Sequence, residues 1–114
     1  MNTISIFNKE ELFERYMNEK EVIKEVIDIF LKSAIEKIDL LKDAIEIKDY
    51  EKIKFNAHSI KGQAYNMSAK QLGDIALKIE INAKNYDIDQ ISENFIALKD
   101  AFLKIKDILL KIEI

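Results

Sequence analysis

The clearest periodicity in the chain lies in residues 87–112, DIDQISENFIALKDAFLKIKDILLKI. Apolar side chains recur there every three or four positions, the spacing that places them on one face of an α-helix. They are Ile91, Phe95, Leu98, Phe102, Ile105, Leu109 and Ile112. An unbroken pattern of this length predicts a long amphipathic helix that begins near Asp87 or Asp89 and buries one face.

The same spacing predicts four further helices, over residues 9–17, 19–47, 49–66 and 68–84. Asn8 precedes the first of these and Asp49 opens the third, and both residue types cap helix N-termini through their side chains. The run Ser-Ala-Lys-Gln that begins at Ser68 matches the capping box S-x-x-Q. We therefore expect Ser68 to open the fourth helix.

The composition excludes most other folds. The chain has 114 residues but only two glycines and no proline. β-Sandwiches and barrels need many turns, and parallel α/β folds need loops that contain glycine, so long helices suit this chain best. Short connections make neighbouring helices antiparallel. We predict a single all-α domain over residues 1–114, an antiparallel up-down four-helix bundle with a short additional N-terminal helix.

Composition and charge also limit the function. The absence of cysteine removes disulfides, thiolate metal sites and thiol nucleophiles, and a single histidine makes a metal site improbable. A net charge of −3, with Arg15 as the only arginine, argues against nucleic acid as a partner. No apolar run approaches the roughly 18 residues of a membrane span, and the polar N-terminus is no signal peptide. We therefore expect a cytoplasmic protein with no membrane contact.

The chemistry-bearing residues gather around His58, the only histidine. At about 100° per residue, His58 lies ~140° from the apolar stripe of its helix, so its imidazole is expected to be exposed. The residues that fall on the same outer side are Glu51, Lys54, Lys61, Gly62 and Tyr65. An exposed imidazole with a cation three residues later suits a phosphoryl group. An idle surface histidine and a solvated lysine are the alternatives.

Gly62 favours the functional interpretation of His58. A glycine inside a helix costs about 1 kcal/mol relative to alanine, so a chain with two glycines needs a reason to place one there. Gly62 lies one turn after His58 on the same face, where the missing side chain would leave room for a bulky partner. The other glycine, Gly73, is expected to let two helices approach closely.

Glu80 is the expected partner of the imidazole. A hairpin that folds back near residues 67–69 places Glu80 opposite His58. A carboxylate that accepts the Nδ1–H would fix the tautomer and leave Nε2 as a nucleophile of raised basicity. The alternative is a surface ion pair between Glu80 and Lys84, four residues later on the same helix.

These residues resemble the histidine phosphotransfer (HPt) domain family, whose centre reads A-H-[TS]-[LI]-K-G and is followed by L-x-x-L-[AC]-x-x-[LI]-E. The matching positions are Ala57-His58-Ser59-Ile60-Lys61-Gly62, then Asn66, and then Leu72, Ala76, Ile79 and Glu80. The resemblance covers about residues 29–109. It departs at Tyr65, where the family usually has a small residue, and at Ser68, where a glycine is common.

The resemblance implies a phosphorelay carrier. His58 would accept a phosphoryl group from the aspartate of a receiver domain and pass it to a second receiver. Lys61 would neutralise the charge of that group and Glu80 would orient His58, while Gly62 and Tyr65 would lie on the docking face. The resemblance also implies a monomer without cofactor, ATP site or kinase activity, whose partners are receiver domains and a hybrid histidine kinase.

Two other functions suit the same bundle. An adaptor would bind a receiver or kinase without carrying phosphate, and a self-associating helical protein would form a stable oligomer. Because the chain begins with Met and contains no kinase or receiver segment, we expect a stand-alone carrier. Docking would use the exposed side of the helix that carries His58 together with Phe13, Tyr16 and Met17, unless these three residues only close the bundle end.

Overall fold

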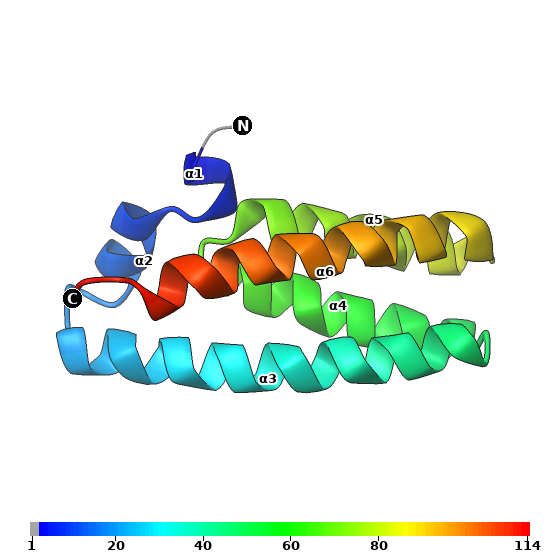
Figure 1. The fold of residues 1–114 in the computed structure, drawn as a ribbon, viewed down its shortest axis with the longest axis horizontal. Coiled ribbons are helices and arrows are strands. Elements are labelled where there is room, and N and C mark those ends of the chain that lie inside the picture. Colours follow the sequence, from blue (N-terminus) through cyan, green and yellow to red (C-terminus); the bar gives the residue numbers. More distant parts are fainter. Residues whose placement is uncertain (1–2) are drawn as a thin grey trace.

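The computed structural model describes residues 3–114, and all regular secondary structure in that range is helical. The elements are α1 (Thr3–Ile6), α2 (Lys9–Arg15), α3 (Lys20–Glu46), α4 (Tyr50–Asn66), α5 (Lys70–Lys84) and α6 (Ile88–Leu110). Figure 1 shows α3 to α6 running alternately up and down, with α1 and α2 gathered at one end of the bundle. The predicted four-helix bundle is confirmed, and α2 is the predicted N-terminal helix. The one-turn helix α1 was not predicted.

The core of the bundle consists of the apolar stripes of its four long helices. Fully buried side chains on these helices include Ile23, Leu41, Ile53, Ile60, Leu72, Ile79, Ile91, Leu98 and Ile105. Burying a side chain of this size contributes about 1.5–3 kcal/mol, so these stripes supply most of the driving force for folding. Phe30 of α3 meets Phe102 of α6 with ring centroids 6.3 Å apart. No helix within the described residues is long and apolar enough to cross a membrane.

Three helices begin with side-chain caps, two of which, Asn8 and Asp49, the sequence predicts. Asn8 accepts a hydrogen bond from the backbone N–H of Glu11, and Asp49 accepts one from Lys52. Asp87 caps α6 through Gln90, which settles where that helix begins. Each such cap is worth about 0.5–2 kcal/mol because it satisfies a backbone N–H that has no partner inside the helix.

The predicted capping box at Ser68 is wrong. The N-cap of α5 is Ala69, which makes no side-chain cap, and Ser68 has a φ of 60°. Its backbone N–H donates to Tyr65 O, and that of Ala69 donates to Ala64 O. These two bonds form a Schellman motif, so Ser68 belongs to the end of α4 and occupies the left-handed position that glycine usually takes.

The same motif closes the other two turns of the bundle. Lys48 and Tyr86 have φ values of 55° and 54°, and each is followed by a residue whose N–H reaches back into the preceding helix. A left-handed conformation costs a residue other than glycine roughly 1–2 kcal/mol. The chain therefore makes tight turns with almost no glycine by accepting local strain at three positions.

Arg15 ties α2 to the turn between α4 and α5. Its Nη1 donates to the backbone oxygen of Asn66 at 2.7 Å and to Ser68 Oγ at 2.8 Å. Its Nη2 contacts Glu11 Oε1 at 3.2 Å. The backbone of Asn8 adds a hydrogen bond to Ser68 O. This long-range contact explains why the Ser68 hydroxyl caps no helix.

Candidate functional site

His58 lies near the middle of α4, on the side away from the core. Its helix is held in place by Ile53, Ala57 and Ile60, which are completely buried. The His58 side chain is 66% exposed. Helical periodicity placed His58 off the apolar stripe of α4, and its imidazole is exposed as that position predicts.

Glu80 contacts the imidazole from the neighbouring helix α5. Its Oε2 lies 3.1 Å from His58 Nδ1, and the residue itself is buried. An ionised carboxylate only accepts hydrogen bonds, so the proton is assigned to Nδ1 and Nε2 keeps its lone pair. The alternative partner, Lys84 Nζ, is 4.0 Å from the same oxygen and makes the weaker contact.

Contacts with Lys61 and His58 keep Glu80 ionised. Burial by itself raises the pKa of Glu80, but the contacts with Lys61 and His58 lower it by more, so the pKa lies below that of an ordinary glutamate. The carboxylate is therefore charged at neutral pH, where it accepts a hydrogen bond from the Nδ1–H of His58.

Lys61 lies on the other oxygen of the same carboxylate. Its Nζ is 2.8 Å from Glu80 Oε1, and its side chain is only 21% exposed. Lys61 therefore extends from α4 toward α5, where it pairs with Glu80. Lys61 and His58 thus contact different oxygens of one carboxylate.

Gly62 is exposed, and packing within the described chain does not require it. A Cβ built at this position would have no described atom within 4 Å. The glycine therefore leaves a bare patch of α4 one turn after His58.

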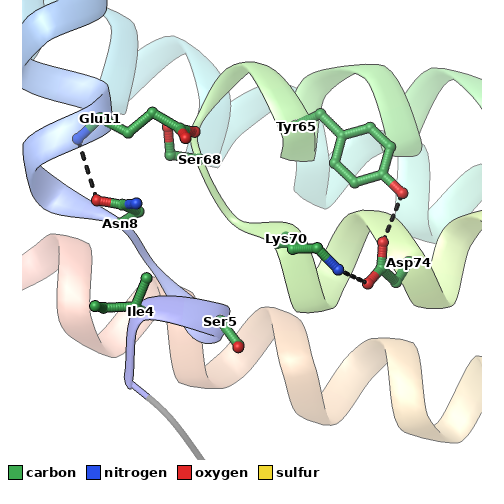
Figure 2. A pocket seen from close by; sticks show the side chains of 8 residues that line it. All are labelled: Ile4, Ser5, Asn8, Glu11, Tyr65, Ser68, Lys70 and Asp74. Atoms are coloured by element: carbon green, nitrogen blue, oxygen red, sulfur yellow. Dashed lines mark hydrogen bonds and ion pairs between the residues drawn. The ribbon is translucent and has the colours of Figure 1, made fainter.

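Tyr65 is partly exposed, and its ring packs against α5. Its ring covers Gly73 on α5, where an added Cβ would overlap the ring carbons. Its hydroxyl donates to Asp74 Oδ1 at 2.7 Å, and Figure 2 shows Lys70 reaching the other oxygen of that carboxylate. Burial and the carboxylate of Asp74 raise the pKa of Tyr65 to about 12. Gly73 therefore makes room for the Tyr65 ring, which joins α4 to α5.

Four of the described residues, besides Glu80, lie around His58. An open hollow of about 420 Å³ beside the imidazole is lined by Glu51, Lys54, Phe55, His58, Glu80 and Lys84. Side chains in a helix lean toward its N-terminus, so the imidazole lies over the turn that contains Lys54 and Phe55. Lys54 was recognisable from its place on the outer face, whereas Lys84 entered the sequence analysis only as a possible surface partner of Glu80.

A family model of the Hpt domain matches residues 25–108, nearly three quarters of the chain. The chain belongs to the Hpt domain family. The matched region agrees with the resemblance over residues 29–109 that the motif around His58 indicated. It contains every site residue named above.

Among curated proteins, this Hpt domain is similar to the phosphorelay intermediate protein rdeA of Dictyostelium discoideum. The two are 27% identical over 93 residues, which is 82% of this chain and 37% of the relative. The chain thus spans little more than a third of that protein's length.

Two solved structures share the fold. Histidine-containing phosphotransfer protein B (HptB) from Pseudomonas aeruginosa PAO1 matches with a TM-score of 0.88 and 18% identity, over 93% of this chain and 92% of that one. The HPT domain from the Hpt sensor hybrid histidine kinase of Shewanella matches with a TM-score of 0.80 and 14% identity, over 95% and 93%. At such low identities the likeness establishes the four-helix bundle.

Proposed function

We propose that residues 1–114 form a single Hpt domain. We propose further that this domain is a phosphorelay carrier in two-component signalling and that His58 is its phosphoacceptor. Membership of the family and the likeness to a phosphorelay intermediate protein support this role. The observation that carries the assignment to His58 is its contact with Glu80. An exposed imidazole with Nδ1 3.1 Å from a buried, ionised carboxylate has its other nitrogen free for attack.

The proposed reaction is in-line attack of His58 Nε2 on the phosphorus of a receiver's aspartyl phosphate. The Nε2 lone pair forms the new N–P bond, and the O–P bond breaks with its electrons left on the receiver aspartate. The imidazole becomes positively charged, and Glu80 stabilises it through Nδ1–H. The reverse reaction with a second receiver passes the group on. Because such a transition state is loose, positioning supplies most of the rate.

In this proposal Lys61 and Gly62 assist His58 in different ways. Lys61 supplies positive charge that offsets the negative charge of the phosphoryl group, and it does so from its position on Glu80. Gly62 leaves room for the receiver to approach His58 closely. Tyr65, 37% exposed, reaches the edge of this docking face while its hydroxyl remains on Asp74.

We propose that receivers dock across Gly62 and a shallow groove between α3 and α4. The groove is lined by Tyr16, Val26, Ile29, Phe30, Ser33, Gln63, Asn66 and Met67. Ile29, which lines the groove, is well exposed. Met17, at the neighbouring end of the bundle, is also well exposed. Phe13 and Tyr16 are both half-buried against the core, whereas Met17 is well exposed, and of these three predicted docking residues Tyr16 lines the groove.

The partners that suit this role are receiver domains and a histidine kinase. We propose that the domain works as a cytoplasmic monomer, with no cofactor or kinase activity of its own. Phosphate would come from a phosphorylated receiver, and the machinery of that receiver would supply the rest of the catalysis.

The decisive test is phosphoryl transfer from a phosphorylated receiver domain, measured by intact mass with His58→Gln as the control. One added phosphoryl group that is labile in acid, stable in base and absent from the variant would support the carrier role. Binding of receivers without any label would instead identify an adaptor built on the same fold.

A further inference from the structure

The Glu80 carboxylate has two oxygens, and a different lysine lies nearest to each. Lys61 Nζ is 2.8 Å from Oε1 and is mostly buried. Lys84 Nζ is 4.0 Å from Oε2, the same oxygen that contacts His58 Nδ1, and its side chain is 59% exposed. Lys84 is therefore the lysine that shares a carboxylate oxygen with the imidazole.

The two lysines differ in how readily they can move. An exposed ion pair at 4.0 Å contributes little to stability, so Lys84 can leave Glu80 at small cost. Lys61 cannot, because its departure would remove the main partner of Oε1 on a buried carboxylate. A new anion near His58 would therefore attract Lys84 first.

The space for such an anion is the hollow beside the imidazole. It is lined by cations from both helices, Lys54 from α4 and Lys84 from α5, whereas Lys61 is not part of its lining. The acidic residue Glu51 also lines it and pairs with Lys54 Nζ at 3.3 Å, so Lys84, at 4.0 Å from Glu80, is the less closely paired of the two cations. A phosphoryl group on Nε2 projects away from Glu80 and has this open space beside it.

We propose that Lys84, assisted by Lys54, holds the phosphoryl group on His58, while Lys61 remains on Glu80 as a positioning residue. This inference rests on the proposed phosphorelay function. On phosphorylation the Lys84 ammonium exchanges its long contact with Glu80 for a direct contact with phosphoryl oxygens. Lys54 adds a second positive charge from the preceding turn of α4.

The test phosphorylates His58 with phosphoramidate, so that no receiver is needed. Nε2 attacks phosphorus, the P–N bond of phosphoramidate breaks, and ammonia leaves. The pKa of the bound phosphoryl group is then read from the ³¹P chemical shift across a pH titration. A cation in contact with the group lowers this pKa, so Lys84→Gln should raise it by about half to one unit. Lys54→Gln should raise it less.

Three variants make the result specific. Lys84→Arg should restore the wild-type value, because it keeps the charge. Lys61→Gln should shift the midpoint less than Lys84→Gln does. Lys104→Gln is the matched control, since Lys104 is an exposed lysine of α6 paired to Asp100 at 3.2 Å. Its midpoint should equal that of the wild type.

The inference is overturned if Lys84→Gln titrates like Lys104→Gln, or if Lys61→Gln gives the largest shift. Either result leaves the carrier function standing, because His58 is labelled in both. If neither phosphoramidate nor any phosphorylated receiver labels His58, the carrier function itself fails and this inference falls with it. The two failures are thus separate observations.

Discussion

His58 Nδ1 and Glu80 Oε2 lie 3.1 Å apart, although 22 residues separate them in the chain. The contact joins an exposed imidazole on α4 to a buried carboxylate on α5, and the register of this helical hairpin creates it. Glu80 also pairs with Lys61, so a single carboxylate fixes the position of two side chains.

Replacing this carboxylate by an amide should slow phosphoryl transfer. Glu80→Gln keeps the shape of the side chain but removes the charge that stabilises the phosphorylated imidazole. Carboxylates that orient a histidine in this way are typically worth about 10- to 100-fold, so we expect a loss of that size in the single-turnover rate from a phosphorylated receiver. Glu93→Gln, an exposed glutamate of α6, is the control and should transfer at the wild-type rate. Equal rates in both variants would contradict the orienting role of Glu80.

The lowered pKa of Glu80 makes its contribution to stability depend on pH. Because the folded pKa lies below the ordinary value of 4.5, the stabilisation is fully present above 4.5 and is lost as the pH falls through the folded pKa. The free energy of unfolding of wild type and of Glu80→Gln can be measured in urea from about pH 7 to about pH 3. The difference between the two proteins should be constant above the ordinary pKa of 4.5 and should become smaller at lower pH. A difference that grew toward acid pH would show that Glu80 is not ionised in the folded protein.

Substitution of Gly62 should raise the stability of the protein but lower the rate of phosphoryl transfer from a receiver. Gly62→Gln introduces a better helix former into open space, so the free energy of unfolding should rise by up to about 1 kcal/mol. The same side chain covers the surface beside His58, and transfer from a receiver should fall at least about tenfold. Labelling by phosphoramidate should be unaffected, because that donor is small. Unchanged receiver transfer would remove the clearance role.

Gly73→Ala should destabilise the hairpin through Tyr65. The new Cβ would overlap the tyrosine ring, and overpacking of this kind costs about 1–3 kcal/mol. In a Tyr65→Leu background the added methyl meets no ring, so the same substitution should cost much less. Urea unfolding of the four proteins forms a double-mutant cycle. Additive effects would mean that Tyr65 does not pack on Gly73 in solution.

Glycine at the left-handed turn positions should stabilise the bundle. Lys48→Gly relieves strain of about 1–2 kcal/mol but makes the unfolded chain freer by about 0.4–1 kcal/mol, so we expect a net gain of up to about 1 kcal/mol. Ser68→Gly should gain less, because it also removes the hydroxyl that accepts from Arg15. The order of the two midpoints in urea checks this expectation, and a larger gain at position 68 would argue against the Arg15 contact.

Residue spacing was sufficient to predict the four-helix bundle. The stripes of Ile23, Ile53, Leu72 and Ile91 became the buried faces, because amphipathic periodicity depends only on the geometry of each helix. The caps at Asn8, Asp49 and Asp87 were predictable for the same reason, since each forms within one turn of its own helix. The contact between His58 and Glu80 followed from the length of the hairpin.

Contacts between elements could not be predicted from local patterns. Ser68 has the sequence of a capping box, but it closes α4 and receives a bond from Arg15, 53 residues earlier. Tyr65 lies on Gly73 and donates to Asp74, and nothing within α4 indicates that direction. Each of these side chains had several partners within reach, and the packing of α2, α4 and α5 determined which one it met.

The sequence by itself therefore determined the bundle, the exposure of His58 and the pairing of its ring with Glu80, because each follows from helical geometry and the length of one hairpin. Only the tertiary structure decided that Lys61 lies on Glu80 Oε1 and that Lys84 lies nearest Oε2, the oxygen that contacts His58 Nδ1. Long, flexible ammonium side chains take their positions from the electrostatic field of the assembled helices, and that field exists only after folding.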